Sequence, residues 1–190
     1  MVPVAADRIA DPRLLDRAAR GEVAAFDEIL RPRLPRLYRM ALAVTRSEMD
    51  ARDAVQDASV SAWRELPRLR AKDRFDSWLD QILVNACRSQ LRRTRRVHVR
   101  EVALDDAAGA DATAGFATVA ADHDPSETDL IQRAFERLSP DVRTLLVLHY
   151  VEGRPLAEIG RLTGSPVGTI KWRLHRARGA LDRALEVERR

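Results

Sequence analysis

The fold of this chain is decided by a stretch near its C-terminal end, Pro155-Leu-Ala-Glu-Ile-Gly-Arg-Leu-Thr-Gly164 followed by Ser165-Pro-Val-Gly-Thr-Ile-Lys-Trp-Arg-Leu-His-Arg-Ala-Arg178. Pro155 suits the first position of a helix, and Gly164 suits the left-handed residue that ends one. Ser165 is a candidate N-cap for a second helix, with Pro166 at its first position. The stretch therefore predicts a short helix, a tight turn and a longer basic helix.

The second of these helices has an apolar side and a basic side. Its apolar residues recur at spacings of four, three and four, which places them in one buried stripe: Ile170, Leu174, Ala177 and Leu181. Another face carries Lys171, Trp172, His175 and Arg176. A capped helix with a buried stripe and a basic outer face fits the major groove of DNA, so the stretch predicts a helix-turn-helix DNA reader.

Composition limits the chain to a few classes. Its 190 residues suffice for one large or two small domains, and 45% hydrophobic residues suffice for a core. The net charge of +4 is modest. Cys87 is the only cysteine, which excludes an intrachain disulfide. Because no signal-peptide pattern and no apolar run of membrane-spanning length is present, we expect a cytoplasmic protein without membrane insertion.

Helical periodicity dominates the first half of the chain, and no alternation typical of strands stands out. We expect an N-terminal tail over 1–11 and a helical domain over 12–96, with helices near 12–18, 22–45, 48–66 and 74–94. Pro32 and Pro35 are expected to bend or restart the second helix, and Asp73 is a candidate cap for the last.

The segment 97–128 differs in composition from its neighbours. Between Glu101 and Asp129 it contains acidic residues but no lysine or arginine, and it is rich in Ala, Gly, Asp and Thr. Such a segment cannot bury enough apolar surface to fold alone, which predicts a flexible acidic linker. A second helical domain is expected over 129–190, with a helix restarted at Ser139-Pro140. The predicted fold is all-α, with two small helical domains joined by a linker.

The helix near 78–96 is also two-sided. Its inner face is predicted to contain Trp78, Leu79, Ile82, Leu83 and Ala86, and its outer face Asn85, Arg88, Ser89, Arg92, Arg93 and Arg96. An exposed arginine row suits a phosphate backbone, although it is equally consistent with a solvated surface. The amide of Asn85 adds a group that can hydrogen-bond to a base edge.

The preceding helix carries a mixed acidic and apolar face formed by Asp53, Gln56, Asp57 and Val60. Its buried side is predicted to contain Val55, Ala58, Ala62 and Leu66. The mixed face is either plain solvent surface or a docking site for a protein partner. The loop from Pro67 to Arg74 joins the two helices and is expected to lie beside Asn85, where it can close over a flipped base.

Other notable residues have simpler interpretations. Trp63 and Trp78 are expected to pack in the core, and Cys87 is expected to be a small buried hydrophobic residue. The histidines lack metal-ligand spacing, so no metal and no cofactor is expected. Trp172 is either a DNA contact or a contact with another domain. No catalytic constellation stands out, so we expect no enzyme.

Three stretches together resemble the extracytoplasmic-function (ECF) group of RNA polymerase sigma factors. Residues 50–63 (Asp50-Ala-Arg-Asp-Ala-Val-Gln-Asp57 and onward) resemble the polymerase-docking helix of that group. Residues 75–93 resemble its −10-element helix, and residues 138–181 resemble its −35-reading domain, with Ser165-Pro-Val-Gly-Thr-Ile-Lys171 as the closest match. The three stretches in this order make the resemblance specific, and the predicted linker lies outside it.

The resemblance implies an alternative sigma factor that binds core RNA polymerase, recognises the −10 and −35 promoter elements and promotes DNA melting. The clamp helices of the polymerase would contact Asp53, Gln56, Asp57 and Val60. Asn85 and the loop 67–74 would capture an unstacked base, beside Arg88, Ser89, Arg92, Arg93 and Arg96. The −35 duplex would meet Ser165, Thr169, Lys171, Trp172, Arg173, His175 and Arg176, while the same domain contacts the polymerase flap. The linker would follow the RNA channel, and an anti-sigma factor would be a further partner.

Two other functions remain open on the residues alone. A free-standing helix-turn-helix regulator explains the C-terminal domain but leaves Asn85 and the arginine row unused. A non-DNA adaptor module would not explain the basic helix. This function predicts that the protein shows no salt-dependent DNA binding.

Overall fold

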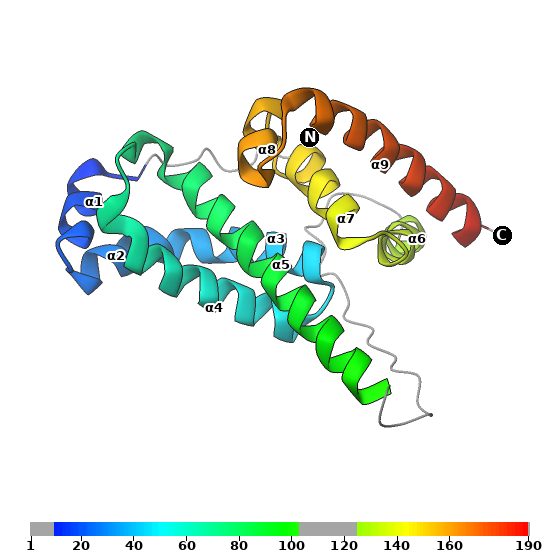
Figure 1. Cartoon of the computed structure of the whole chain (residues 1–190), viewed down its shortest axis with the longest axis horizontal. Coiled ribbons are helices and arrows are strands. Elements are labelled where there is room, and N and C mark those ends of the chain that lie inside the picture. Colours follow the sequence, from blue (N-terminus) through cyan, green and yellow to red (C-terminus); the bar gives the residue numbers. More distant parts are fainter. Residues whose placement is uncertain (1–9, 103–124, 190) are drawn as a thin grey trace. The chain divides into compact units, whose positions relative to one another are not determined.

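The computed structural model describes residues 10–102 and 125–189, and every regular element among them is a helix or a helical turn. These residues belong to two compact units, one before and one after the segment 103–124 (Figure 1). The predicted all-α fold with two helical domains is therefore confirmed. Most of the predicted N-terminal tail and the central part of the predicted linker lie outside the described residues.

The first unit contains α1 (Pro12–Ala19), α2 (Val23–Leu30), α3 (Leu34–Thr45), α4 (Glu48–Glu65) and α5 (Phe75–Val102). Short 3₁₀ turns cover Arg31–Arg33, Leu66–Arg68 and Lys72–Arg74. Pro32 lies in the first of these turns, so the helix predicted over 22–45 is restarted there, as expected. Asp73 lies inside the 3₁₀ turn before α5 rather than at a cap, because the chain is already helical at Lys72.

Local capping explains where α4 begins and where α3 ends. The hydroxyl of Ser47 accepts a hydrogen bond from the backbone N–H of Asp50 at 3.2 Å, which satisfies one of the free donors of the first turn of α4. Arg46, between the two helices, adopts a left-handed conformation with a φ of 65° and ends α3. The two helices can therefore turn back on each other within a two-residue connection.

A ridge of small residues holds α4 against its neighbours. Ala51, Ala54, Ala58 and Ala62 are each at most 1% exposed. Because alanine side chains are short, α3 and α5 can approach the α4 backbone closely, and both pack on it (Figure 1). Of the predicted inner face of α5, Leu79 and Leu83 are fully buried, while Trp78, Ile82 and Ala86 are only half-buried. The predicted inner face of α5 is therefore confirmed at Leu79 and Leu83, and the buried side is centred on them because α3 and α4 both pack on α5.

Two ion pairs fix the first turns of α5 against α3 and the turn that precedes it. Arg33 donates to both carboxylate oxygens of Asp76, and its guanidinium lies 5.4 Å from the centre of the Phe75 ring. Arg36 donates to both oxygens of Asp80, at 2.6 Å and 3.2 Å, and the Asp80 side chain is completely buried. These bidentate contacts fix the direction in which α5 leaves the 3₁₀ turn.

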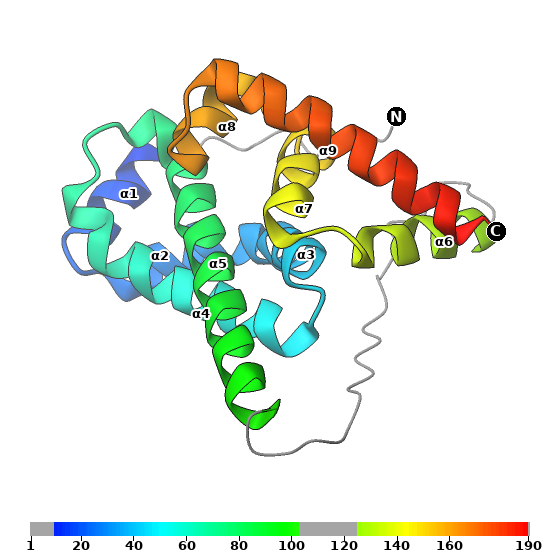
Figure 2. The ribbon, with the colours of Figure 1, turned by 45° about the vertical axis from the view of Figure 1, so that its right-hand side comes forward.

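The second unit contains α6 (Pro125–Glu136), α7 (Pro140–Leu146), a π-helical turn over Val147–Val151, α8 (Leu156–Thr163) and α9 (Val167–Glu188). Figure 2 shows α8 at the start of α9, with α6 beside the other end and α7 between them, and all three pack on α9. Arg133 on α6 and Arg137, directly after α6, both donate to the carboxylate of Glu188 at the end of α9. Helix α9 is therefore supported along its whole length.

Helices extend into both ends of the segment predicted as a linker. Helix α5 continues to Val102, and α6 begins at Pro125. Residues 97–102 contain neither glycine nor proline, so nothing in their composition ends the helix there. Pro125 suits the first position of α6.

Candidate nucleic-acid interface

The helix-turn-helix is built around the turn between α8 and α9. Gly164 ends α8 in the left-handed conformation, as predicted, with a φ of 66°. Helix α9 begins at Val167, with Pro166 as its N-cap and no side-chain cap bond. The prediction that Ser165 caps α9 is wrong, because Ser165 lies one residue before the N-cap and belongs to the turn that ends α8, where its backbone N–H donates to the Gly160 carbonyl at 2.8 Å. Its hydroxyl instead accepts a hydrogen bond from Arg173 at 3.2 Å.

A close backbone approach fixes the angle of this turn. A Cβ atom on Gly160 would lie 2.7 Å from the carbonyl oxygen of Ser165, closer than such atoms can come. Ile159 on α8 and Ile170 on α9 are both completely buried beside this contact. Glycine at this position therefore lets the start of α9 lie directly on α8, and it sets the side of α9 that faces solvent.

The exposed side of α9 carries the residues predicted to meet the −35 duplex. Lys171, Trp172, Arg173, His175 and Arg176 are exposed, and Ser165 and Thr169 are half-buried at the turn. Ile170, Leu174 and Ala177 form the buried stripe, whereas Leu181 is only half-buried. We call the exposed set, with Ser165 and Thr169, the recognition face.

Trp172 lies on the recognition face itself. Its side chain is 57% exposed, and the Arg176 guanidinium carbon lies 4.9 Å from the centre of its ring. This cation–π contact between residues one turn apart restricts the rotamers of the arginine. Trp172 can therefore present the Arg176 guanidinium in a fixed direction.

Helix α5 carries the set predicted to contact the −10 element, which we call the arginine face: Asn85, Arg88, Ser89, Arg92, Arg93 and Arg96. Asn85, Arg92 and Arg93 are exposed, and Arg88 and Ser89 are half-buried. Arg96 is in the helix, but its side chain lies outside the described residues. The helical spacing brings the side chains of Asn85, Arg88, Ser89, Arg92 and Arg93 to one side of α5. That the loop 67–74 lies beside Asn85 stays a prediction.

Helix α4 presents the set predicted to dock on the polymerase, the docking stripe: Asp53, Gln56, Asp57 and Val60. Asp53, Gln56 and Val60 are exposed. Asp57 points to α5, where its carboxylate accepts a hydrogen bond from Gln90 at 3.0 Å and lies 3.5 Å from Arg93. Asp57, a member of the docking stripe, therefore also contacts Arg93 of the arginine face. The sequence pattern did not show this contact.

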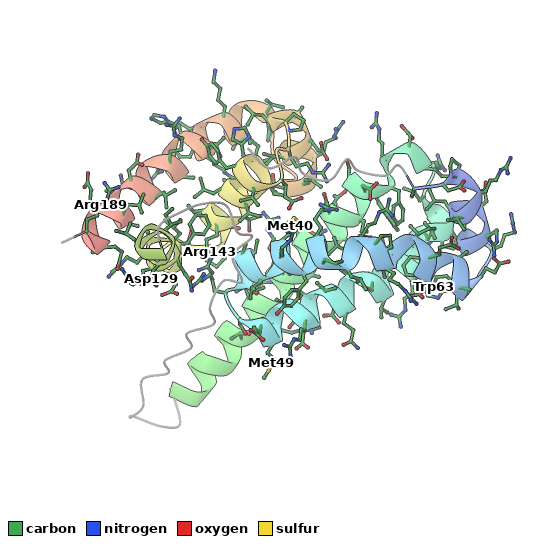
Figure 3. All side chains as sticks on the ribbon, turned by 180° about the vertical axis from the view of Figure 1, so that it is seen from behind. Met40, Met49, Trp63, Asp129, Arg143 and Arg189 are labelled. Atoms are coloured by element: carbon green, nitrogen blue, oxygen red, sulfur yellow. The ribbon has the colours of Figure 1, made fainter. Side chains whose placement is uncertain are left out.

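Met49 is an exposed apolar residue that sequence reasoning missed. Its side chain is 74% exposed, and it precedes Asp53 by one helical turn, so it extends the docking stripe toward the start of α4. Figure 3 shows Met49 and Trp63 near opposite ends of α4. The signal that identifies Met49 comes from the structure, where a large apolar side chain is exposed beside a polar stripe.

Comparison with known proteins decides the family. The model of "Sigma-70 region 2" matches residues 29–97, and that of "Sigma-70, region 4" matches residues 128–181. The ECF RNA polymerase sigma factor SigM of Mycobacterium tuberculosis is 36% identical over 175 residues, which span 92% of this chain and 84% of SigM. The chain belongs to the ECF RNA polymerase sigma factors. The resemblance seen in the sequence is therefore confirmed, and this alternative sigma factor acts with core RNA polymerase at promoter DNA.

Two further relatives cover both regions of this sigma factor. The RNA polymerase sigma-H factor of Pseudomonas aeruginosa is 28% identical over 181 residues, which span 93% of this chain and 94% of the relative. The solved structure of the sigma factor RpoE of Bartonella quintana, in complex with the anti-sigma factor NepR, superposes with a TM-score of 0.68 at 28% identity. That comparison covers 85% of this chain and 97% of RpoE.

The remaining candidate chemistry of this sigma factor is limited. Cys87 is buried, as predicted, and burial raises the pKa of its thiol to about 12, so it remains a neutral thiol. Trp63 packs on Phe26 with ring centres 5.2 Å apart, and Trp78 on Phe75 at 5.6 Å. Among residues 10–102 and 125–189, no cluster of ligating side chains could hold a metal ion. In the same part of the chain, no helix is long and apolar enough to span a membrane.

Proposed function

We propose that this sigma factor divides promoter recognition between two helices, with the arginine face of α5 at the −10 element and the recognition face of α9 at the −35 element. The observation that carries the proposal is that each unit exposes one basic helix face whose opposite side is buried. A basic face held by a packed helix binds phosphates through charge and reads bases through its amide and guanidinium groups. The protein acts in the cytoplasm and is not an enzyme.

At the −10 element, Asn85 captures an unstacked base of the non-template strand. Its amide can donate to and accept from a base edge, which a purely cationic face cannot do. The arginines of the same face, including Arg88, Arg92 and Arg93, hold the backbone on either side. The loop 67–74 closes over the extruded base, so that opening of the duplex is coupled to recognition.

At the −35 element, α9 enters the major groove with the recognition face toward the bases. Lys171 and Arg176 are the long cations that can reach base edges or phosphates, and His175 lies between them. Trp172 orders Arg176 through the cation–π contact of 4.9 Å. Ser165 and Thr169 lie where the start of a recognition helix meets the DNA.

The docking stripe on α4 contacts the clamp helices of core RNA polymerase, and the second unit contacts the flap. Asp53 and Gln56 supply polar contacts, and Val60, with 43% of its side chain exposed, supplies apolar area. An anti-sigma factor is a further partner, since the superposable RpoE was solved bound to one.

The test is run-off transcription by the reconstituted holoenzyme on a library of promoter-like templates. We expect Asn85→Ala to reduce promoter opening by roughly 5- to 150-fold, as for loss of a bidentate base contact, without weakening polymerase binding. We expect Lys171→Ala with Arg176→Ala to reduce protection of the −35 DNA and leave −10 opening on a pre-melted template unchanged. Loss of holoenzyme assembly in Asn85→Ala, or full −35 protection in the double variant, would refute these assignments.

A further inference from the structure

The α4–α5 loop (Pro67–Arg74) has few internal restraints. Its ends are fixed by Leu66 and Phe75, which are 3% and 1% exposed. Between them, two 3₁₀ turns are joined by Leu69, Arg70 and Ala71, which form no regular structure. Arg68, Arg70 and Arg74 are exposed. A loop of this kind is positioned mainly by the side chains that tie it to its surroundings.

Helix α1 supplies such a tie. The ammonium group of Lys72 in the loop donates a hydrogen bond to the carboxylate of Asp16 on α1. The hydrogen bond from Lys72, which is the largest influence, holds the pKa of Asp16 below its usual range. The two residues are 56 positions apart in the sequence, so the pair links the loop to α1 and is not a contact within one helix.

The anchor is itself rigidly held. Leu15 and Ala18 on α1 are 0% and 2% exposed, and α1 packs on both 3₁₀ turns of the loop as well as on α2. Asp11 caps the helix by accepting from the Arg13 backbone N–H at 2.9 Å. Because α1 is fixed by its buried side, the Asp16 carboxylate is a fixed point to which the loop can be tied.

Asp16 lies outside the part of the chain that matches a family model. The "Sigma-70 region 2" match begins at residue 29, after α1 and most of α2. A sequence comparison restricted to residues 29–97 would therefore include the loop but not Asp16, to which the loop is tied. Three of the four loop cations are exposed arginines, whereas the fourth, Lys72, is held against α1.

We propose that Asp16 is a positioning residue for the loop that closes over the extruded −10 base, and that it acts through Lys72. The inference rests on the function proposed above for that loop. A loop held in place before DNA binds loses less conformational entropy when the base enters, so the tie favours the open promoter complex. It also narrows the set of loop conformations, which sharpens discrimination between bases at the captured position.

The experiment uses full-length holoenzyme carrying Asp16→Asn, Lys72→Met, or the charge exchange Asp16→Lys with Lys72→Asp. Open-complex formation is followed by permanganate reactivity on the preferred promoter and on templates with the captured base replaced. We expect each single variant to form open complex about two- to five-fold less well and to discriminate less between bases, as for loss of one partly exposed ion pair. The charge exchange should recover most of both losses.

Controls separate positioning from simple loss of folding. Arg17→Met breaks the nearby Arg17–Glu22 pair, which does not reach the loop, and should leave open-complex formation and base discrimination unchanged. Polymerase affinity should be equal for all variants. A structural defect alone would lower the unfolding temperature without changing the ratio of activities on the two kinds of template.

Three outcomes overturn the inference. The first is that Asp16→Asn behaves like Arg17→Met, and the second is that the charge exchange recovers nothing. The third is that only Lys72→Met is impaired, which would mean that Lys72 contacts DNA directly. Each leaves the proposed function standing if the unsubstituted holoenzyme still opens promoters in an Asn85-dependent way. A silent Asn85→Ala variant would instead overturn the proposed function.

Discussion

Replacing Asp80 by alanine should strongly destabilise the first unit. The Asp80 side chain is completely buried, and its partner Arg36 is 14% exposed and bonds both carboxylate oxygens at 2.6 Å and 3.2 Å. Removing the carboxylate leaves a guanidinium in the interior without its counter-charge. Breaking a buried pair in this way costs about 3–5 kcal/mol, a large part of the roughly 5–15 kcal/mol that stabilises a typical domain.

The change can be measured by urea denaturation of the full chain. Trp63 and Trp78 lie in the first unit, so a Trp172→Phe background makes intrinsic fluorescence report that unit alone. With a urea dependence of about 1–2 kcal/mol per molar, the midpoint should fall by roughly 1.5–5 M. Asp27→Ala is the matched control, because the Arg31–Asp27 pair has side chains 75% and 52% exposed. Its loss should cost at most about 0.5 kcal/mol.

Equal midpoints for Asp80→Ala and Asp27→Ala would refute this reasoning about burial. If Asp80→Ala does not fold, a second variant carries the test. Replacing both partners, Arg36→Met with Asp80→Leu, removes the charges together and should recover most of the lost stability. Failure of the double replacement to recover stability would show that the pair is required for its geometry and not only for charge compensation.

Three more results are expected. Gly160→Ala should lower the unfolding free energy of the second unit by about 1–3 kcal/mol in thermal denaturation, because the new Cβ meets the Ser165 carbonyl, whereas Gly179→Ala should raise it by up to about 1 kcal/mol. Arg137 and Arg133 hold the pKa of Glu188 below its ordinary 4.5, so its contribution is present above that pH and lost as pH falls through the lower folded-state pKa. Glu188→Gln should therefore flatten the fall in stability as the pH decreases below 4.5. Cys87 should react with a thiol reagent only in denaturant, because burial raises its pKa to about 12.

Structural features that depend on a few neighbouring residues could be predicted from the sequence. Gly164 ends α8 because glycine adopts a positive φ without strain, and the spacing of Ile170, Leu174 and Ala177 placed them in one buried stripe. Pro32 interrupted a predicted helix for an equally local reason. The helix-turn-helix could be identified before the structure because the helix end at Gly164 and the apolar periodicity after it agreed.

The errors arose where several helices meet. The buried side of α5 was predicted to include Trp78 and Ile82 together with Leu79 and Leu83, but only Leu79 and Leu83 of these four are completely buried. Hydrophobic periodicity shows that a helix has an apolar side. Which residues lie at the centre of the buried side depends on the neighbouring helices that cover it. Ser165 was misassigned because α9 begins one residue later than predicted, at Val167, which makes Pro166 the N-cap.

Ion pairs between residues far apart in the sequence could not be predicted from sequence patterns. Arg36 and Asp80 are 44 positions apart, and no local spacing in the sequence connects them. Each looks like one more charge on a helix surface until the fold brings α3 against α5. The Asp16–Lys72 contact is of the same kind, since only the docking of α1 on the loop makes it a pair.

Asp57 shows how this limits the interpretation of the candidate sites. The sequence assigned it to polymerase docking, but its carboxylate accepts from Gln90 at 3.0 Å and lies 3.5 Å from Arg93 on the arginine face. A substitution at Asp57 therefore changes the charge environment of Arg93, which we propose to contact the −10 strand, as well as the docking stripe. Asp53 and Gln56 are exposed on the same helix, so their substitution reports on docking more directly. Comparing Asp53 and Asp57 variants separates assembly of the holoenzyme from binding of the −10 strand, which a single substitution in the docking stripe cannot do.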